Sequence, residues 1–151
     1  MRFLVSCFPL IVCISGQRFD TKEVREMADG FESYFDRGER YAVLFVPSLG
    51  SELPGPQERK LISAWADHPR TLELSRRFCV GTAVLVENVL VRAALAALMA
   101  FRGSASKVES VPTVDKGLEY CIRRIKDAGL QLNKPPDLVR FELRRLVDQA
   151  R

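Results

Sequence analysis

The sequence predicts an α/β fold with a mixed, largely parallel sheet of four to five strands, helices packed against it, and an extra C-terminal helix. Short apolar runs alternate with amphipathic segments along most of the chain, a pattern that implies crossover connections between parallel strands. Two apolar runs, at residues 2–6 and 9–15, come first with no helical segment between them, which predicts an antiparallel N-terminal hairpin. The run from Tyr41 to Val46 is apolar throughout and is typical of a strand buried on both faces.

The apolar N-terminus has a second interpretation, a secretory signal peptide. Arg2 supplies the basic start, but residues 13–17, CISGQ, make a poor cleavage site, and Pro9 divides the apolar run in two. Because Pro is tolerated at a turn or at the start of a strand, we interpret residues 2–6 and 9–15 as two strands. A bilayer span needs ~20 apolar residues, so we expect no membrane span and a cytoplasmic protein.

A helix is predicted over residues 20–39. Asp20 and Glu23 form an Asp version of the capping box, and Gly38 provides a left-handed stop. The apolar stripe of this helix, spaced i, i+3, i+4, i+7 and i+11, consists of Val24, Met27, Ala28, Phe31 and Phe35.

A turn-rich loop, LGSELPGPQ, follows the central strand at 40–48, and Pro56 then suits the first turn of a helix. One face of this helix carries Leu61, Ile62 and Trp65. The features expected after it are, in order, a break or kink at Pro69, further helical turns at 71–78, a strand at 79–86, a helix at 87–103 with Asn88 as N-cap and Gly103 as stop, a strand at 107–114, a helix at 113–129 and a helix at 137–151.

The net charge of +4 lies entirely in the C-terminal third of the chain. Over residues 102–151, Lys and Arg exceed Asp and Glu by 11 − 7 = +4. A basic end can meet nucleic acid, acidic lipid or an acidic protein, yet intermixed charges of this kind are typical of a solvated helix face. We therefore do not expect nucleic acid as a partner.

No motif of a nucleotide, metal or hydrolase site occurs in the sequence, so we expect no enzyme, no cofactor and no metal. His68 is the single histidine, and we interpret it as a surface residue at a helix end. The four cysteines form no CxxC pair and are interpreted as small buried hydrophobes. Cys79 follows Arg76 and Arg77, whose charge could lower its thiol pKa and give it a redox role.

Three stretches carry a family resemblance. Residues 9–48 run as an apolar strand ending in Gly, an acid-capped helix, a Gly and a hydrophobic strand; residues 79–98 and 111–122 each run from a strand into a helix. In this order they resemble the STAS domain, the fold of sulphate transporters and anti-sigma-factor antagonists, and more narrowly small bacterial SpoIIAA-like proteins. The resemblance covers residues 1–128 and implies a regulatory signalling adaptor that binds partner proteins and catalyses nothing.

The resemblance also points to a site in the loop after the central strand. Anti-sigma-factor antagonists resemble one another in an Asp-Ser-Ser-Gly-like loop that holds a phosphorylated Ser; here the loop reads PSLGSELPGPQ, without an Asp before either Ser. Ser48 and Ser51 are candidate phosphoacceptors, and ordinary turn serines are the alternative. The partner-binding residues expected in this loop, the next helix and the C-terminal helix are Leu49, Gly50, Glu52, Arg59, Leu138, Phe141, Arg144 and Arg145.

We divide the chain into a STAS-like domain at 1–131 and a C-terminal amphipathic helix at 132–151. The apolar stripe of that helix either packs back on the core or docks a partner or a second copy, so a homodimer stays open. The stripe consists of Val139, Leu143, Leu146, Val147 and Ala150, and the basic face of Arg140, Arg144, Arg145 and Arg151.

Three functions compete on this evidence. The first is a non-catalytic regulatory adaptor that binds partner proteins through the loop after the buried strand and the adjacent helix, with the C-terminal helix as a further contact. The second is a small-molecule or nucleotide-binding module that uses the strand ends. The third is a hydrolase that pairs a Ser or Cys with His68. We prefer the adaptor because catalytic motifs are missing and the resemblance favours it.

Overall fold

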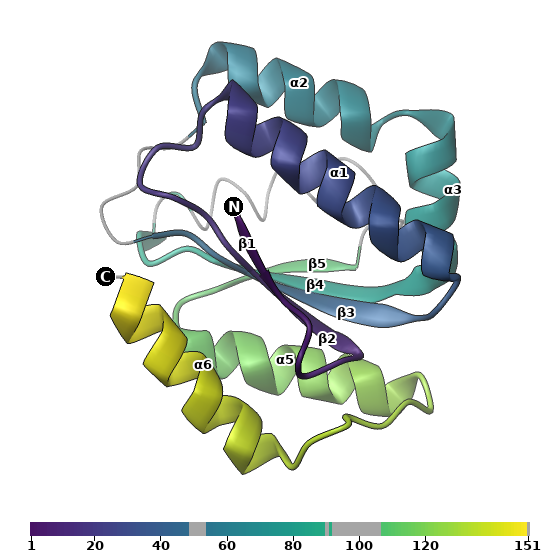
Figure 1. Ribbon diagram of the computed structural model, residues 1–151, viewed down its shortest axis with the longest axis vertical. Helices are drawn as coiled ribbons and strands as arrows, with labels where there is room; N and C mark the ends of the chain where they lie inside the picture. The colour runs from purple at the N-terminus through teal and green to yellow at the C-terminus, as the bar shows by residue number, and fades with distance from the viewer. Residues whose placement is uncertain (49–53, 90, 92–106, 151) are drawn as a thin grey trace.

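A mixed sheet of five strands lies at the centre of the molecule (Figure 1). The computed structural model describes residues 1–48, 54–89, 91 and 107–150. The strands lie side by side in sequence order: the first is antiparallel to the second, and all other neighbours are parallel. The α/β class, the mixed sheet and the N-terminal hairpin are thereby confirmed. The strands are β1 (Arg2–Leu4), β2 (Leu10–Ile14), β3 (Tyr41–Val46), β4 (Cys79–Leu85) and β5 (Val108–Val111).

Strands β2 and β3 are covered by apolar groups on both faces. On β2, Leu10 and Val12 belong to one hydrophobic cluster, whereas Ile11 belongs to a second cluster on the opposite face. On β3, Leu44 and Val43 divide in the same way. Successive side chains of a strand point to opposite faces, so a strand that is apolar throughout supplies both clusters at once. The prediction of double-sided burial for β3 is confirmed.

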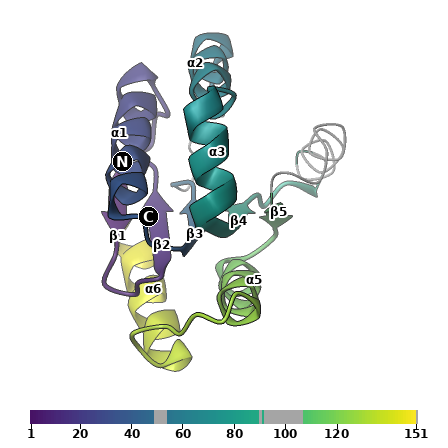
Figure 2. The same cartoon turned by 90° about the vertical axis from the view of Figure 1, so that its right-hand side faces the viewer.

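One face of the sheet is covered by α1 (Thr21–Arg37), α2 (Pro56–Ala66) and α3 (Pro69–Phe78), as Figure 2 shows. These helices belong to the crossovers from β2 to β3 and from β3 to β4. Since such crossovers are right-handed and the strands advance in one direction, both fall on the same face. Pro69 begins a separate helix of ten residues, longer than the turn or two expected at 71–78.

The ends of α1 follow the sequence prediction in part. Asp20 caps the helix, since its Oδ1 accepts from the Glu23 backbone N–H at 2.9 Å, and Gly38 ends the helix at a φ of 66°. The expected return hydrogen bond of the capping box, from the Asp20 backbone N–H to the Glu23 carboxylate, is wrong. The Glu23 carboxylate does not return to Asp20; its Oε1 accepts from the Gly16 N–H at 2.5 Å. The hydrogen bond of Glu23 with Gly16, seven residues earlier in the chain, has therefore replaced the expected one with Asp20.

The other face is covered by α5 (Val114–Asp127) and α6 (Pro136–Ala150) (Figure 1). Gly117 lets α5 approach β3 closely: a Cβ there would lie 2.5 Å from Leu44 Cδ1. The stripe of α6 packs back on the core, which settles the two alternatives for that stripe, because Val139, Leu143 and Val147 are buried in the same cluster as β2 and α5.

The helix expected at 87–103 lies almost wholly outside the described residues. Its start is described, and Asn88 Oδ1 accepts from the Val91 N–H at 3.2 Å. This hydrogen bond joins the N-cap side chain to the third following residue, as a capping Asn does. The N-cap prediction for Asn88 is confirmed, and Gly103 lies outside the described part of the chain.

Leu143→Ala should show how strongly α6 is held to the core. Leu143 is 3 % exposed, so its truncation leaves a cavity. We expect the free energy of unfolding to fall by about 2–5 kcal/mol. Leu138, on the same helix, is 44 % exposed, and Leu138→Ala should cost less than about 1 kcal/mol. Urea unfolding followed by circular dichroism measures both. Equal losses would mean that α6 is not packed as described.

Candidate functional site

The carboxyl ends of the parallel strands meet along one edge of the sheet, on the left in Figure 1, where α1, α2 and α5 begin. In open parallel sheets this edge is where ligands and partners gather. The loop predicted as the site leaves β3 at this edge and leads into α2. Of the residues predicted there, Leu49, Gly50, Ser51 and Glu52 lie outside the described residues; Ser48 and Arg59 are described.

Ser48 fastens the end of β3 to the end of β2. Its backbone N–H donates to Ser15 Oγ at 3.2 Å, and its hydroxyl donates to the Ser15 carbonyl. Ser15 is buried, and its own N–H donates to the Val46 carbonyl at 3.1 Å. We call these contacts the serine clasp. Sequence reasoning missed Ser15, whose only signal was a small polar residue at the end of an apolar strand.

Glu23 forms a second polar contact beside the clasp. Its Oε1 lies 3.2 Å from the Met1 amino group, and Glu26 Oε2 lies 2.6 Å from the same nitrogen. Burial alone would lower the pKa of this amino group, but its hydrogen bonds to Glu26 and Glu23 raise the pKa above its ordinary value. The start of α1 is thus tied to the edge strand β1 and to the turn after β2.

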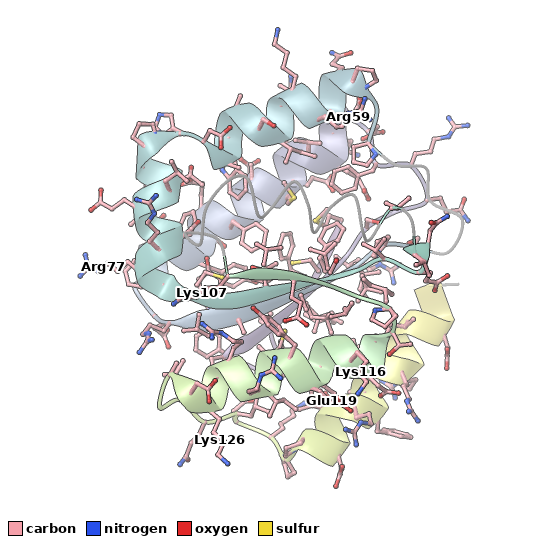
Figure 3. All side chains as sticks on the ribbon, turned by 180° about the vertical axis from the view of Figure 1, so that it is seen from behind. Arg59, Arg77, Lys107, Lys116, Glu119 and Lys126 are labelled. Carbon is pink, nitrogen blue, oxygen red and sulfur yellow. The ribbon has the colours of Figure 1, made fainter. Side chains whose placement is uncertain are left out.

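Helix α2, which follows the predicted loop, has no fully buried residue among its eleven, although Ile62 is partly buried. Leu61 is 36 % exposed, and Trp65 is half-buried with its ring 5.8 Å from that of Phe31 on α1. Arg59 is exposed, and its Nη1 donates to the Pro54 carbonyl at 2.8 Å. Figure 3 shows Arg59 near the start of α2. The helix therefore exposes an apolar side chain, Leu61, and a basic one, Arg59.

A hollow of about 310 Å³ opens at the ends of β4 and β5, between α5 and α6. Arg144 Nη2 donates to Asp115 Oδ2 at 2.7 Å across it, and Arg140 Nε lies 3.4 Å from Asp115 Oδ1. Three carboxylates and one guanidinium line it, so its charge is net negative. The described lining residues are Leu85, Glu87, Pro112, Thr113, Val114, Asp115, Arg144, Val147 and Asp148.

Three of the four predicted binding residues of α6 lie on its outer side. Phe141 is 66 % exposed and Leu138 is 44 % exposed, and Arg145 is also exposed. Arg144 points instead to α5 through its ion pair with Asp115. The structure therefore separates Arg144, in the hollow, from the other three residues.

Among the described residues, His68 and the four cysteines form no pair of nucleophile and base. His68 is exposed at the start of α3, and no described Ser or Cys side chain forms a hydrogen bond to it. All four cysteines are free. Burial raises the pKa of the Cys121 thiol to about 12 and also raises that of Cys79, so the neighbouring arginines do not activate Cys79. No group of metal-ligating side chains occurs in the part of the chain that the structure describes.

No family model, no curated protein and no solved structure matches this chain. Among the described helices, none is long and apolar enough to cross a bilayer.

Removal of the Ser48 hydroxyl should weaken the serine clasp. Ser48→Ala deprives the buried Ser15 carbonyl of its donor, and an unsatisfied buried acceptor costs about 1–3 kcal/mol. Ser33 is the matched control, because its hydroxyl also donates to a carbonyl, that of Gly30, but on the exposed side of α1. Thermal unfolding should show a lower midpoint for Ser48→Ala and almost no change for Ser33→Ala. Identical midpoints for the two variants would contradict the clasp.

Proposed function

We propose that this chain is a non-catalytic regulatory adaptor, STAS-like in organisation and cytoplasmic, that binds a partner protein through the loop after β3 and helix α2. The observation that carries the proposal is that no residue of α2 is fully buried. Short helices owe most of their stability to packing of an apolar face, and exposed apolar groups rimmed by polar ones mark interaction sites. A partner that covers Leu61 would complete the packing of α2.

The serine clasp gives the proposed loop a fixed starting point. Ser48 remains a candidate phosphoacceptor, and a phosphate on its oxygen would remove the proton that it donates to Ser15. Phosphorylation would therefore release the start of the loop from the end of β2 and change the surface offered beside α2. Four free thiols agree with a reducing compartment such as the cytoplasm.

Charge reversal on α2 should abolish partner binding. Arg59→Glu replaces an exposed cation of α2, and we expect recovery of the partner in a quantitative pull-down to fall at least about tenfold, as for a charge pair whose one member is removed. Lys126→Glu on α5 is the matched control, since it makes the same charge change on the opposite face of the sheet (Figure 3). A partner recovered equally with Arg59→Glu and with the unaltered chain would refute the role of α2.

The hollow between α5 and α6 favours a second candidate, a small-molecule binding module at the strand ends. Its volume of about 310 Å³ is at the low end for ligand sites. The hollow lies beside the ends of β4 and β5. Its net negative lining opposes the phosphates of a nucleotide and suits a small organic cation.

A thermal-shift experiment separates this candidate from the adaptor. If the hollow binds cations, a small diamine at concentrations well above its dissociation constant should raise the unfolding midpoint, while ATP should not. Asp115→Asn should remove the effect, and Asp29→Asn, an exposed acid on α1, should retain it. If neither ligand shifts the unfolding midpoint, the hollow is not a binding site and results only from the packing of α5 against α6.

A further inference from the structure

The outer side of α6 carries an ordered row of three unlike side chains. Asp137, Phe141 and Arg145 are four residues apart, so they lie on one ridge of the helix. The Asp137 side chain is 94 % exposed, Phe141 is 66 % exposed, and Arg145 is exposed. The buried stripe at Val139 and Leu143 lies on the opposite side, so the ridge faces away from the core.

We propose that this ridge binds the same ridge of a second copy of the chain, in antiparallel orientation, with a two-fold axis at Phe141. A two-fold interface must be self-complementary, because each surface patch meets itself. The row acid, aromatic, base satisfies this requirement. Reversed about Phe141, it sets Asp137 of each copy against Arg145 of the other, while the two Phe141 rings meet at the axis.

Charge fixes the direction of this pairing. In a parallel pairing, Asp137 would face Asp137 and Arg145 would face Arg145, and like charges in contact are repulsive. The antiparallel pairing replaces both repulsions with attractions. The ridge carries one acid and one base, so it has no net charge to attract an acidic lipid surface or nucleic acid, and a second copy matches it best.

The existing contacts of these side chains leave them available for the pairing. Asp137 Oδ1 has an exposed contact of 3.3 Å with Arg140 Nη1, one helical turn away. Arg140 also contacts Asp115, so it retains an acidic neighbour when Asp137 turns to a second copy. Arg145 has no ion pair with any residue of the described ranges. Leu138, beside the ridge, adds apolar area that the pairing would cover.

Sedimentation equilibrium of the full chain over a range of concentrations tests this interface. We expect a reversible dimer. Phe141→Glu should weaken it by roughly thirtyfold or more, as does loss of a central aromatic anchor. Asp137→Arg and Arg145→Asp should each weaken it by about tenfold, and the double variant, which restores opposite charges with their positions exchanged, should recover most of the affinity.

Control variants distinguish loss of the α6 interface from loss of folding and from loss of the proposed partner binding through α2. Leu72→Glu on α3, another exposed apolar site at 37 %, should leave the dimer unchanged, as should Arg59→Glu on α2. Circular dichroism should show native helix content in every variant, since the altered side chains are exposed. A chain that stays monomeric up to millimolar concentration, a dimer that survives Phe141→Glu, or a double variant no tighter than the single ones would overturn the proposal.

Discussion

Apolar burial on both faces of β2 and β3 is the constraint on which the rest of the structure depends. Leu10, Val12 and Leu44 supply one cluster, and Ile11 and Val43 supply the other. Neither face can be left to solvent, because each fully buried Leu or Ile contributes about 1.5–3 kcal/mol relative to an exposed one. The chain must therefore provide helices on both sides. Right-handed crossovers deliver α1, α2 and α3 to one side, and the other side is left to the segments that follow β5.

Because helices must cover both faces of the sheet, packing determines which surfaces of α6 and α2 stay exposed to other molecules. The apolar stripe of α6, at Val139 and Leu143, is buried in the core. Only the outer ridge of α6 is therefore free to contact another molecule. On the other side, α1 already covers the start of the sheet, and α2 rests on α1 through the Trp65–Phe31 ring contact rather than on the strands. Its side chains are consequently left half-exposed. The exposed side of α2 and the outer ridge of α6, on opposite faces of the sheet, thus both result from the burial of the two faces of β2 and β3.

Most of the fold could be predicted from the sequence because its signals are local. The stop at Gly38, the caps at Asp20 and Asn88 and the apolar run at 41–46 each depend on residues close in the chain, and each is confirmed. The failures involve distant partners. Glu23 binds Gly16 instead of completing a capping box, and the clasp joins Ser15 to a residue 33 positions away. The apolar face of α2 could not be told from a core-facing one, since Leu61 has the same sequence signal whether it is covered or exposed.

Among the described residues, the polar groups at the carboxyl ends of the strands bond chiefly to one another, which supports the proposed adaptor. The Ser48 hydroxyl is committed to the Ser15 carbonyl, Glu23 to Gly16 and Met1, and Asp115 to Arg144. A general base or nucleophile needs a lone pair or proton directed at a substrate, whereas these groups direct theirs at neighbouring strands and helices. They hold the ends of β2, β3 and α5 in place. This arrangement supports the proposed adaptor, because a surface that is already ordered needs little further ordering when a protein partner binds.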